Sequence, residues 1–364
     1  MNISEQNRDL SEFERLYREK RYLYEDFARD LRDLMEKLIK NAGIPFDKVV
    51  YRTKDIESFL KKIVRKVYDD PFEQIKDFAG VRVITYYQDD AEKVIRMIRA
   101  EFEVDEAESV DKVNHLSANE FGYRSVHLIV SLSQNRAQQP EWKRFAGLWA
   151  EIQVRSVLQD AWADLSHRID YKITSQAPTE LRRRLFRLSA LLELADEEFT
   201  EIRDLSEVIT KGYRDNVSQG RLDLPVNLDS LEEFIEQKVD LQKWAQFGVE
   251  AGMQAFPEIE IDNKYKSGRL GILLRTLQET GITTIAGFEA VFPDFEQRQS
   301  QLQRFVELVK AAGKTVYAVP LDVLILLVSF AKADAIPPDF NWGGRYRPFI
   351  IEALRKVCRE QAGA

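Results

Sequence analysis

The sequence has little of several residue types on which particular functions depend. Its 364 residues include one cysteine, Cys358, and three histidines, which excludes an internal disulfide and disfavours a structural zinc site. A single cysteine fits a reducing cytoplasm. The longest apolar run, 323–331, is far too short to span a membrane, and the N-terminal stretch has no apolar signal core. We therefore expect a soluble cytoplasmic protein with no membrane partner.

Basic residues are also in the minority. Lys and Arg number 53 against 61 Asp and Glu, a formal net charge of -8, whereas proteins that coat nucleic acid need a basic face. Composition therefore disfavours nucleic acid as a partner, although it allows a local basic pocket. What the chain does have is 44% hydrophobic and 11% aromatic residues, enough for the cores of two domains.

The pattern of apolar residues divides the chain into two parts. Strands and helices alternate through residues 1–220, and helices alone follow over 226–364, with Gly220 and Pro225 marking the boundary. This predicts an α/β (α+β) domain with a mixed sheet flanked by helices, then an all-helical C-terminal domain. Residues 105–122 are predicted to form a loop, and 133–143 a hairpin connection.

A long amphipathic helix is predicted over about 177–205. Its apolar residues Leu185, Leu188, Leu192 and Phe199 are expected to face inward. Such a helix can either cover the sheet or pair with a second chain, so a homo-oligomer stays open.

The stretch 149–172 reads as a strand that leads directly into a helix. Strand alternation places Glu151, Gln153 and Arg155 on one face, and Ile152 and Val154 on the other. The apolar face suits a core. A carboxylate, an amide and a guanidinium therefore share the opposite surface.

Two earlier segments carry further charge. Arg52, Lys54, Lys62 and Lys66 lie on the basic side of a short strand and helix, which is either a solvated face or a polyphosphate site. Asp77 stands at the start of the next strand, where a carboxylate either caps a turn or holds a metal ion.

Four separated motifs occur in a recognisable order. They are R-x-K-x-x-x-S-x-x-x-K at Arg52, Lys54, Ser58 and Lys62; D-x-x-G-x-R at Asp77, Gly80 and Arg82; GYRSVH at 122–127; and E-x-Q-x-R with a following W-A-x-x-x-H and YK at 151–172. Over residues 45–175 the chain thereby resembles the synthetase domain of the RelA/SpoT family, the enzymes that make the alarmone (p)ppGpp.

This resemblance implies a nucleotidyltransferase-like fold and a GTP diphosphokinase activity. The family transfers the diphosphate of ATP to the ribose 3'-hydroxyl of GDP or GTP, releases AMP and requires Mg²⁺. The matching positions are Arg52, Lys54, Lys62 and Arg82 for the ATP phosphates, Asp77 and Glu151 as catalytic carboxylates and metal ligands, and Tyr123, His127 and Gln153 for the acceptor nucleotide. The sequence leaves open whether Glu151 is a general base or a metal ligand.

Other activities of similar proteins define the alternatives. The hydrolase domain of long family members is not expected, because none of the three histidines is followed by Asp. Toxin-like relatives, some from toxin-antitoxin pairs, modify the 3' end of tRNA or make adenosine alarmones, and a catalytically inactive regulator is a third reading. The acidic segment at the start of 105–122 would repel tRNA, so GDP or GTP is the expected acceptor.

Within the helical part, 273–292 has a weak helix-hairpin-helix character that could contact nucleic acid, but an ordinary helical turn is the favoured interpretation. Residues 323–331 are apolar on all sides and are predicted to form the buried centre of the bundle. We expect this part to regulate the synthetase or to recognise a partner.

Overall fold

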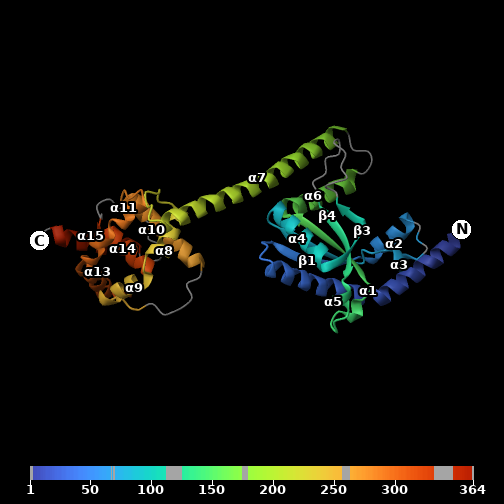
Figure 1. Cartoon of the computed structure of the whole chain (residues 1–364), viewed down its shortest axis with the longest axis horizontal. Helices are drawn as coiled ribbons and strands as arrows, with labels where there is room; N and C mark the ends of the chain where they lie inside the picture. Colours follow the sequence, from blue (N-terminus) through green and yellow to red (C-terminus); the bar gives the residue numbers. More distant parts are fainter. Residues whose placement is uncertain are drawn as a thin grey trace. The chain divides into compact units, whose positions relative to one another are not determined.

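A computed structural model describes residues 3–66, 68, 70–111, 125–173, 179–255, 263–331 and 347–362 of the chain. It forms two compact units, Met1–Asp204 and Leu205–Ala364 (Figure 1). In the described ranges, no helix is both long enough and apolar enough to cross a membrane.

The first unit is built on one five-stranded sheet. Its strands are β1 (Lys48–Thr53), β2 (Ala79–Thr85), β3 (Phe102–Asp111), β4 (Val126–Leu132) and β5 (Trp149–Ser156), in the order β1-β2-β5-β4-β3. The central pair β2 and β5 is parallel, and the other three pairs are antiparallel. The predicted mixed sheet with flanking helices is confirmed.

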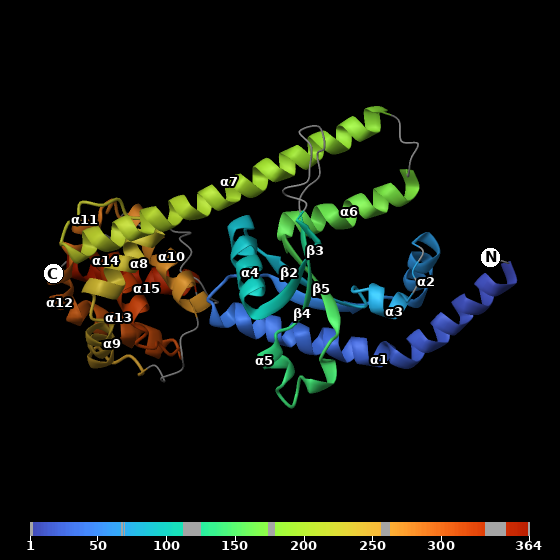
Figure 2. The same cartoon turned by 45° about the vertical axis from the view of Figure 1, so that its right-hand side comes forward.

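Two helices cover one face of this sheet. The apolar residues of α1 (Ile3–Asn41) and α4 (Gln88–Glu101) pack with the inward residues of the strands in one buried cluster. In both views α1 runs along the sheet (Figures 1 and 2). Ile152 and Val154 belong to this core, as their alternation in the sequence predicted. The other face is left for polar side chains.

A second, aromatic cluster holds the helix that carries the lysines. Residues Tyr17 and Tyr24 of α1 contact Phe59 of α2 (Ile56–Arg65) and Phe78, which precedes β2. Asp55 caps α2 by accepting a hydrogen bond from the backbone N of Ser58 at 2.8 Å. The Tyr17 hydroxyl donates to the backbone oxygen of Lys54 at 2.6 Å. The start of α2 is thereby fixed next to the sheet. A one-turn helix, α3 (Pro71–Gln74), leads from there towards β2.

The end of β5 is tied to the long helix. Strand β5 continues directly into α6 (Val157–Ile173), and Gln159 Oε1 accepts from the backbone N of Ser156 at 2.9 Å. The Ser156 hydroxyl donates to Asp196 of α7 (Thr179–Ser218) at 2.5 Å, and both residues are buried. Arg203 of α7 also forms a bidentate pair with Asp89 of α4. These contacts fix the first half of α7 against the first unit.

Several local predictions were wrong. Strand β3 runs to Asp111, so the expected loop does not begin at 105; its remainder, 112–122, lies outside the described residues. By contrast, the hairpin connection predicted over 133–143 is confirmed, because it joins the antiparallel neighbours β4 and β5. This connection contains a one-turn helix, α5 (Gln134–Ala137), and a 3-10 helix (Lys143–Phe145). On α7, Leu188 and Phe199 are exposed rather than inward, whereas Leu185 and Leu192 are half-buried.

The second unit is helical throughout its described part, as predicted. Its helices are α8 (Leu228–Lys238), α9 (Leu241–Glu250), α10 (Asn263–Glu279), α11 (Ile285–Glu289), α12 (Phe292–Glu296), α13 (Gln299–Ala311), α14 (Pro320–Ala331) and α15 (Arg347–Ala362). Helix α14 is the buried centre of this bundle, which confirms the interpretation of 323–331.

The backbone amides at the hairpin-like turn of the second unit form hydrogen bonds within the chain. Gly281 adopts a φ of 71° at the end of α10, and Thr284 caps α11. The backbone N groups of Ile285 and Ala286 donate to the carbonyls of Leu224 and Leu222 at 2.9 and 2.8 Å. Because those amides are satisfied internally, this turn offers no anion site of the helix-hairpin-helix kind, as the favoured interpretation expected.

Candidate active site

Polar side chains gather on the sheet face opposite α1 and α4. Arg52 on β1 is level with Gly80 on β2, and Gly80 is level with Glu151 on β5. In the next row on the same face, Arg82 of β2 is level with Gln153 of β5, and Gln153 is level with His127 of β4. Residues paired across strands point to the same side of a sheet. The fold therefore brings together five residues that the sequence predicted for the site.

Gly80 has no side chain, and this leaves room for Arg52 to reach Glu151. An added Cβ at residue 80 would lie 3.1 Å from Arg52 Cγ and 3.3 Å from Arg52 Nε, closer than the usual contact of about 3.5 to 4.0 Å. Because glycine leaves this space open, the Arg52 side chain crosses β2 and its Nη2 donates to Glu151 Oε2 at 3.0 Å. The glycine of the D-x-x-G-x-R element thus has a steric reason.

Glu151 is partly buried and its environment favours the ionised form. Burial by itself would raise the pKa of this carboxyl, yet His127, Arg52 and Gln153 together lower it from 4.5 to about 2. His127 Nδ1 lies 2.9 Å from Glu151 Oε1, and Gln153 Nε2 donates to Oε2 at 2.7 Å. Since the folded pKa is below the ordinary value, Glu151 stabilises the fold above pH 4.5, and this contribution is lost as the pH falls towards 2.

Asp77 is the second carboxylate of the site. Lys54 Nζ donates to its Oδ2 at 2.7 Å, and Lys62 Nζ donates to its Oδ1 at 2.9 Å. Burial opposes ionisation here too, but the two ammonium groups outweigh it and lower the pKa of Asp77. Both carboxylates are therefore ionised at neutral pH, and nearby cations balance their charge.

A cavity of about 470 Å³ opens above Asp77. It is lined by Lys54, Ser58, Lys61, Lys62, Arg65 and Asp77. This volume is within the range of about 300 to 1,000 Å³ that small-molecule sites occupy. Sequence reasoning missed Lys61 and Arg65, which follow Ser58 and Lys62 by three residues and so share their side of α2. Lys66, which ends the helix, is not among the lining residues.

Arg82 is held by a partner that the sequence did not suggest. Its Nη1 donates to Asp160 of α6 at 3.0 Å, and the same oxygen lies 3.4 Å from Arg155 Nη1. Burial and the nearby charge of Arg82 lower the pKa of Arg155, which Asp160 partly offsets. Gln153 Oε1 and Arg155 Nε are buried without a hydrogen-bond partner among the described residues. Such atoms on a polar face leave hydrogen-bonding capacity for a bound molecule.

One predicted site residue cannot be placed. Tyr123 belongs to 112–124, outside the described residues. The neighbouring Ser125 is described, and its Oγ lies 3.0 Å from His127 Nε2. The GYRSVH element therefore contributes at least His127 to the surroundings of Glu151.

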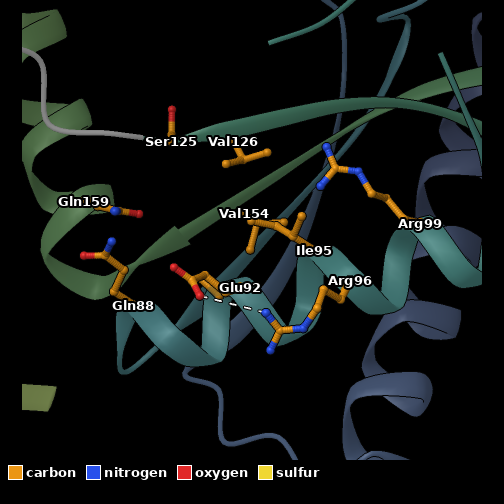
Figure 3. A pocket seen from close by; sticks show the side chains of 10 residues that line it. Gln88, Glu92, Ile95, Arg96, Arg99, Ser125, Val126, Val154 and Gln159 are labelled. Atoms are coloured by element: carbon orange, nitrogen blue, oxygen red, sulfur yellow. Dashed lines mark ion pairs between the residues drawn. The ribbon is translucent and has the colours of Figure 1, made fainter. Parts of the chain in front are cut away.

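A second cavity, of about 240 Å³, lies on the α4 side of the sheet (Figure 3). Its walls include Val126 and Val154 at the strand ends and Arg96 and Arg99 of α4. Arg99 pairs with Glu106 at 3.0 Å, and Arg96 lies 3.9 Å from Glu92. This smaller cavity contains none of the site residues predicted from the sequence, whereas Lys54, Lys62 and Asp77 all line the cavity above Asp77.

Replacing Gly80 should loosen the Arg52 to Glu151 contact. In Gly80→Ala we expect the pKa of Glu151 to rise above about 2, because Arg52 is displaced while His127 and Gln153 remain. Titration of ¹³C-labelled glutamate by NMR, with Glu151→Gln to assign the signal, would measure it. Gly212→Ala on α7, where an added Cβ meets nothing, is the matched control. An unchanged pKa in Gly80→Ala would contradict this role.

Comparison with known proteins agrees with the motifs. Residues 51–176 match the region found in RelA / SpoT proteins. The chain is similar to the GTP pyrophosphokinase YjbM of Bacillus subtilis, with 31% identity over 196 residues that cover 50% of this chain and 88% of that protein. It is also similar to YwaC, a GTP pyrophosphokinase of the same organism, with 29% identity over 163 residues that cover 44% and 74%.

A solved structure is similar to about half of this chain. The crystal structure of the small alarmone synthetase 1 from Bacillus subtilis is 28% identical, covers 52% of this chain with 98% of its own length, and has a TM-score of 0.44. The identity to YjbM over most of that relative, together with the matching family region, is decisive. This chain belongs to the RelA/SpoT family.

Proposed function

We propose that this protein transfers the diphosphate of ATP to the ribose 3'-hydroxyl of GDP or GTP, making (p)ppGpp and AMP. The observation that carries the proposal is the pair of partly buried, ionised carboxylates, Asp77 and Glu151. Lys54 and Lys62 bind Asp77, and Arg52 binds Glu151. The names of the two curated relatives, both GTP pyrophosphokinases, support the guanine acceptor.

The cavity above Asp77 suits the triphosphate of ATP. Lys54 and Lys62 donate to Asp77, and Lys61 and Arg65 line the same space. Phosphate oxygens compete with a carboxylate for ammonium groups, so the lysines are ready to move to the donor. Arg52 and Arg82 approach from the sheet, and for Arg82 the nucleotide competes with Asp160.

The two carboxylates fit a magnesium ion of the kind that accompanies nucleotides. Mg²⁺ in such sites binds one or two carboxylates and the substrate phosphates, and both Asp77 and Glu151 stay ionised at neutral pH. Among the described residues there is no group of three or more potential metal ligands, so the phosphates would have to complete the shell. When bound, the ion would neutralise charge on the transferred group.

The reaction forms a bond between the acceptor 3'-oxygen and the β-phosphorus of ATP, and breaks the bond from that phosphorus to the α-β bridging oxygen. AMP leaves with the bridging oxygen, and the proton of the 3'-hydroxyl passes to solvent. With a pKa of about 2 in the free protein, Glu151 is a weak base, so it serves as a fixed negative charge unless substrate removes its partners. We expect His127, which contacts Glu151, and Gln153, whose Oε1 has no hydrogen-bond partner among the described residues, to contribute to binding of the acceptor.

All of these side chains lie in the first unit. We propose residues 1–220 as the synthetase domain, because this span keeps α7 whole to its end at Ser218, and 226–364 as a helical domain that regulates it or recognises a partner. The nucleotide substrates make the cytoplasm the compartment of the reaction.

The function is tested by the acceptor that receives label. Purified protein with ATP labelled in the β-phosphate is expected to label GDP or GTP, and to label ADP and tRNA poorly. In Tyr123→Ala we expect the KM of the guanine nucleotide to rise more than that of ATP, because an aromatic ring stacks on a base. Efficient labelling of the tRNA 3' end with little label in GDP or GTP would replace the proposed acceptor, and label in no acceptor would indicate a regulator.

Loss of the Glu151 charge should impair turnover while the fold persists. We expect Glu151→Gln to lower kcat by about 100-fold or more. This is the usual loss of rate when a group that takes part in acid-base catalysis is removed. Calorimetric binding of ATP separates this from lost affinity. Glu141→Gln, at an exposed position, is the control. Turnover close to that of the unchanged protein would remove Glu151 from the mechanism.

Asp77→Asn should weaken the response to magnesium. The amide keeps the shape but loses the charge, so we expect activity to fall and half-maximal activity to need more Mg²⁺. Initial rates across a Mg²⁺ titration at saturating ATP measure both effects. A titration curve with the same midpoint as the unchanged protein would count against Asp77 as a metal ligand.

A further inference from the structure

Lys76, the residue before Asp77, forms an ion pair with the far edge of the sheet. Its Nζ donates to Asp105 Oδ2 of the edge strand β3, although β5 and β4 lie between β2 and β3. The two side chains are largely buried, with 25% and 18% of their surface exposed. The Lys76 ammonium also lies 4.7 Å from the ring centroid of Trp149 in β5. A cation over an aromatic ring is a favourable contact, which adds to the ion pair.

Asp105 is held in place by an irregularity in β3. The pairing of β3 with β4 changes register after Asp105. There, Asp105 Oδ1 accepts from the backbone N of Ala107 and of Glu108, both at 3.1 Å, and its carbonyl accepts from the Ser109 hydroxyl at 2.6 Å. Hydrogen bonds from Lys76 and from these amides lower the pKa of Asp105. A strand irregularity of this kind directs a side chain, and here it presents an ionised carboxylate to Lys76.

The segment that carries Asp77 is therefore anchored on several sides. Ile75 and Phe78 are buried in the aromatic cluster, Asp77 binds the two lysines of the cavity, and Lys76 is tied to β3. In the proposed function the cavity lysines also bind phosphates, so a nucleotide weakens their hold on Asp77. Neither Lys76 nor Asp105 is among the described residues that line the cavity. Their ion pair can therefore persist when the nucleotide is bound.

We propose that Lys76 is a positioning residue for the transfer. By pairing with Asp105 it holds the chain next to Asp77, so that this carboxylate stays in place for the metal ion when the cavity lysines turn to the phosphates. A misplacement of about 1 Å can cost about 100-fold in rate, so an anchor at the neighbouring residue matters. This inference rests on the proposed function, because it assigns Lys76 a part in the same site.

Removing the Lys76 charge tests the role. Lys76→Met keeps an unbranched side chain but loses the ion pair. We expect half-maximal activity to need about 10-fold more Mg²⁺ and kcat to fall about 10-fold, the lower end of the loss when a metal ligand is no longer oriented. The KM for ATP should change little, because the cavity cations remain. Initial rates over Mg²⁺ and ATP titrations measure these effects, and Lys76→Arg, which keeps the cation, should restore them.

Asp105→Asn approaches the same contact from the other side. The amide keeps an oxygen for the two backbone N groups and loses the charge that faces Lys76. We expect the same shift of the Mg²⁺ midpoint, and no larger shift in the double variant with Lys76→Met, because both changes remove one interaction. Arg136→Met is the matched control, since Arg136 is 24% exposed and pairs with Glu101 at 2.6 Å. It should leave the Mg²⁺ midpoint unchanged, and thermal unfolding followed by circular dichroism compares the stability of all variants.

Binding without turnover separates this inference from the proposed function. Calorimetric titration of ATP at increasing Mg²⁺ gives the Mg²⁺ midpoint even if the unchanged chain labels no acceptor. Three results would overturn the role of Lys76. They are a midpoint in Lys76→Met or in Asp105→Asn equal to that of the unchanged chain, an equal shift in the Arg136→Met control, and shifts that add in the double variant.

Discussion

The arrangement around the sheet depends on keeping two partly buried carboxylates charged. Burial alone would drive both Asp77 and Glu151 towards the neutral acid, and adjacent cations, joined at Glu151 by the Gln153 amide, reverse that tendency. Much of the surrounding fold serves this purpose. The parallel pairing of β2 with β5 places Gly80 beside Glu151, and the aromatic cluster fixes the helix from which Lys62 reaches Asp77.

The main outline of this arrangement was predictable from the sequence. Alternation along β5 separated Glu151, Gln153 and Arg155 from Ile152 and Val154 because a strand with one buried face has a period of two. The spacing of the lysines placed them on one side of a helix. The order of the motifs gave the family, and with it the expectation that strands distant in sequence would be neighbours.

What the sequence could not provide were contacts that depend on how elements pack. Asp160 pairs with Arg82 across 78 positions of the chain, and no local pattern announces that partner. Leu188 and Phe199 were predicted to be inward because α7 is apolar on two sides, and periodicity does not say which side the sheet will cover. Residues 105–111 of β3 were predicted as a loop because this polar, acidic stretch lacks the alternation of a half-buried strand.

The hydrogen bonds from Lys54 and Lys62 to Asp77 affect which anions can bind in this cavity. Lys54 and Lys62 are each already satisfied by one oxygen of the same carboxylate, so an arriving anion must replace both bonds at once. A lone phosphate offers little beyond what the carboxylate gives, and so gains little by displacing it. A chain of linked phosphates can bind both lysines, reach Lys61 and Arg65, and bring its own divalent cation to compensate the released carboxylate. We therefore expect this site to favour anions with several linked phosphates, whatever base or sugar they carry.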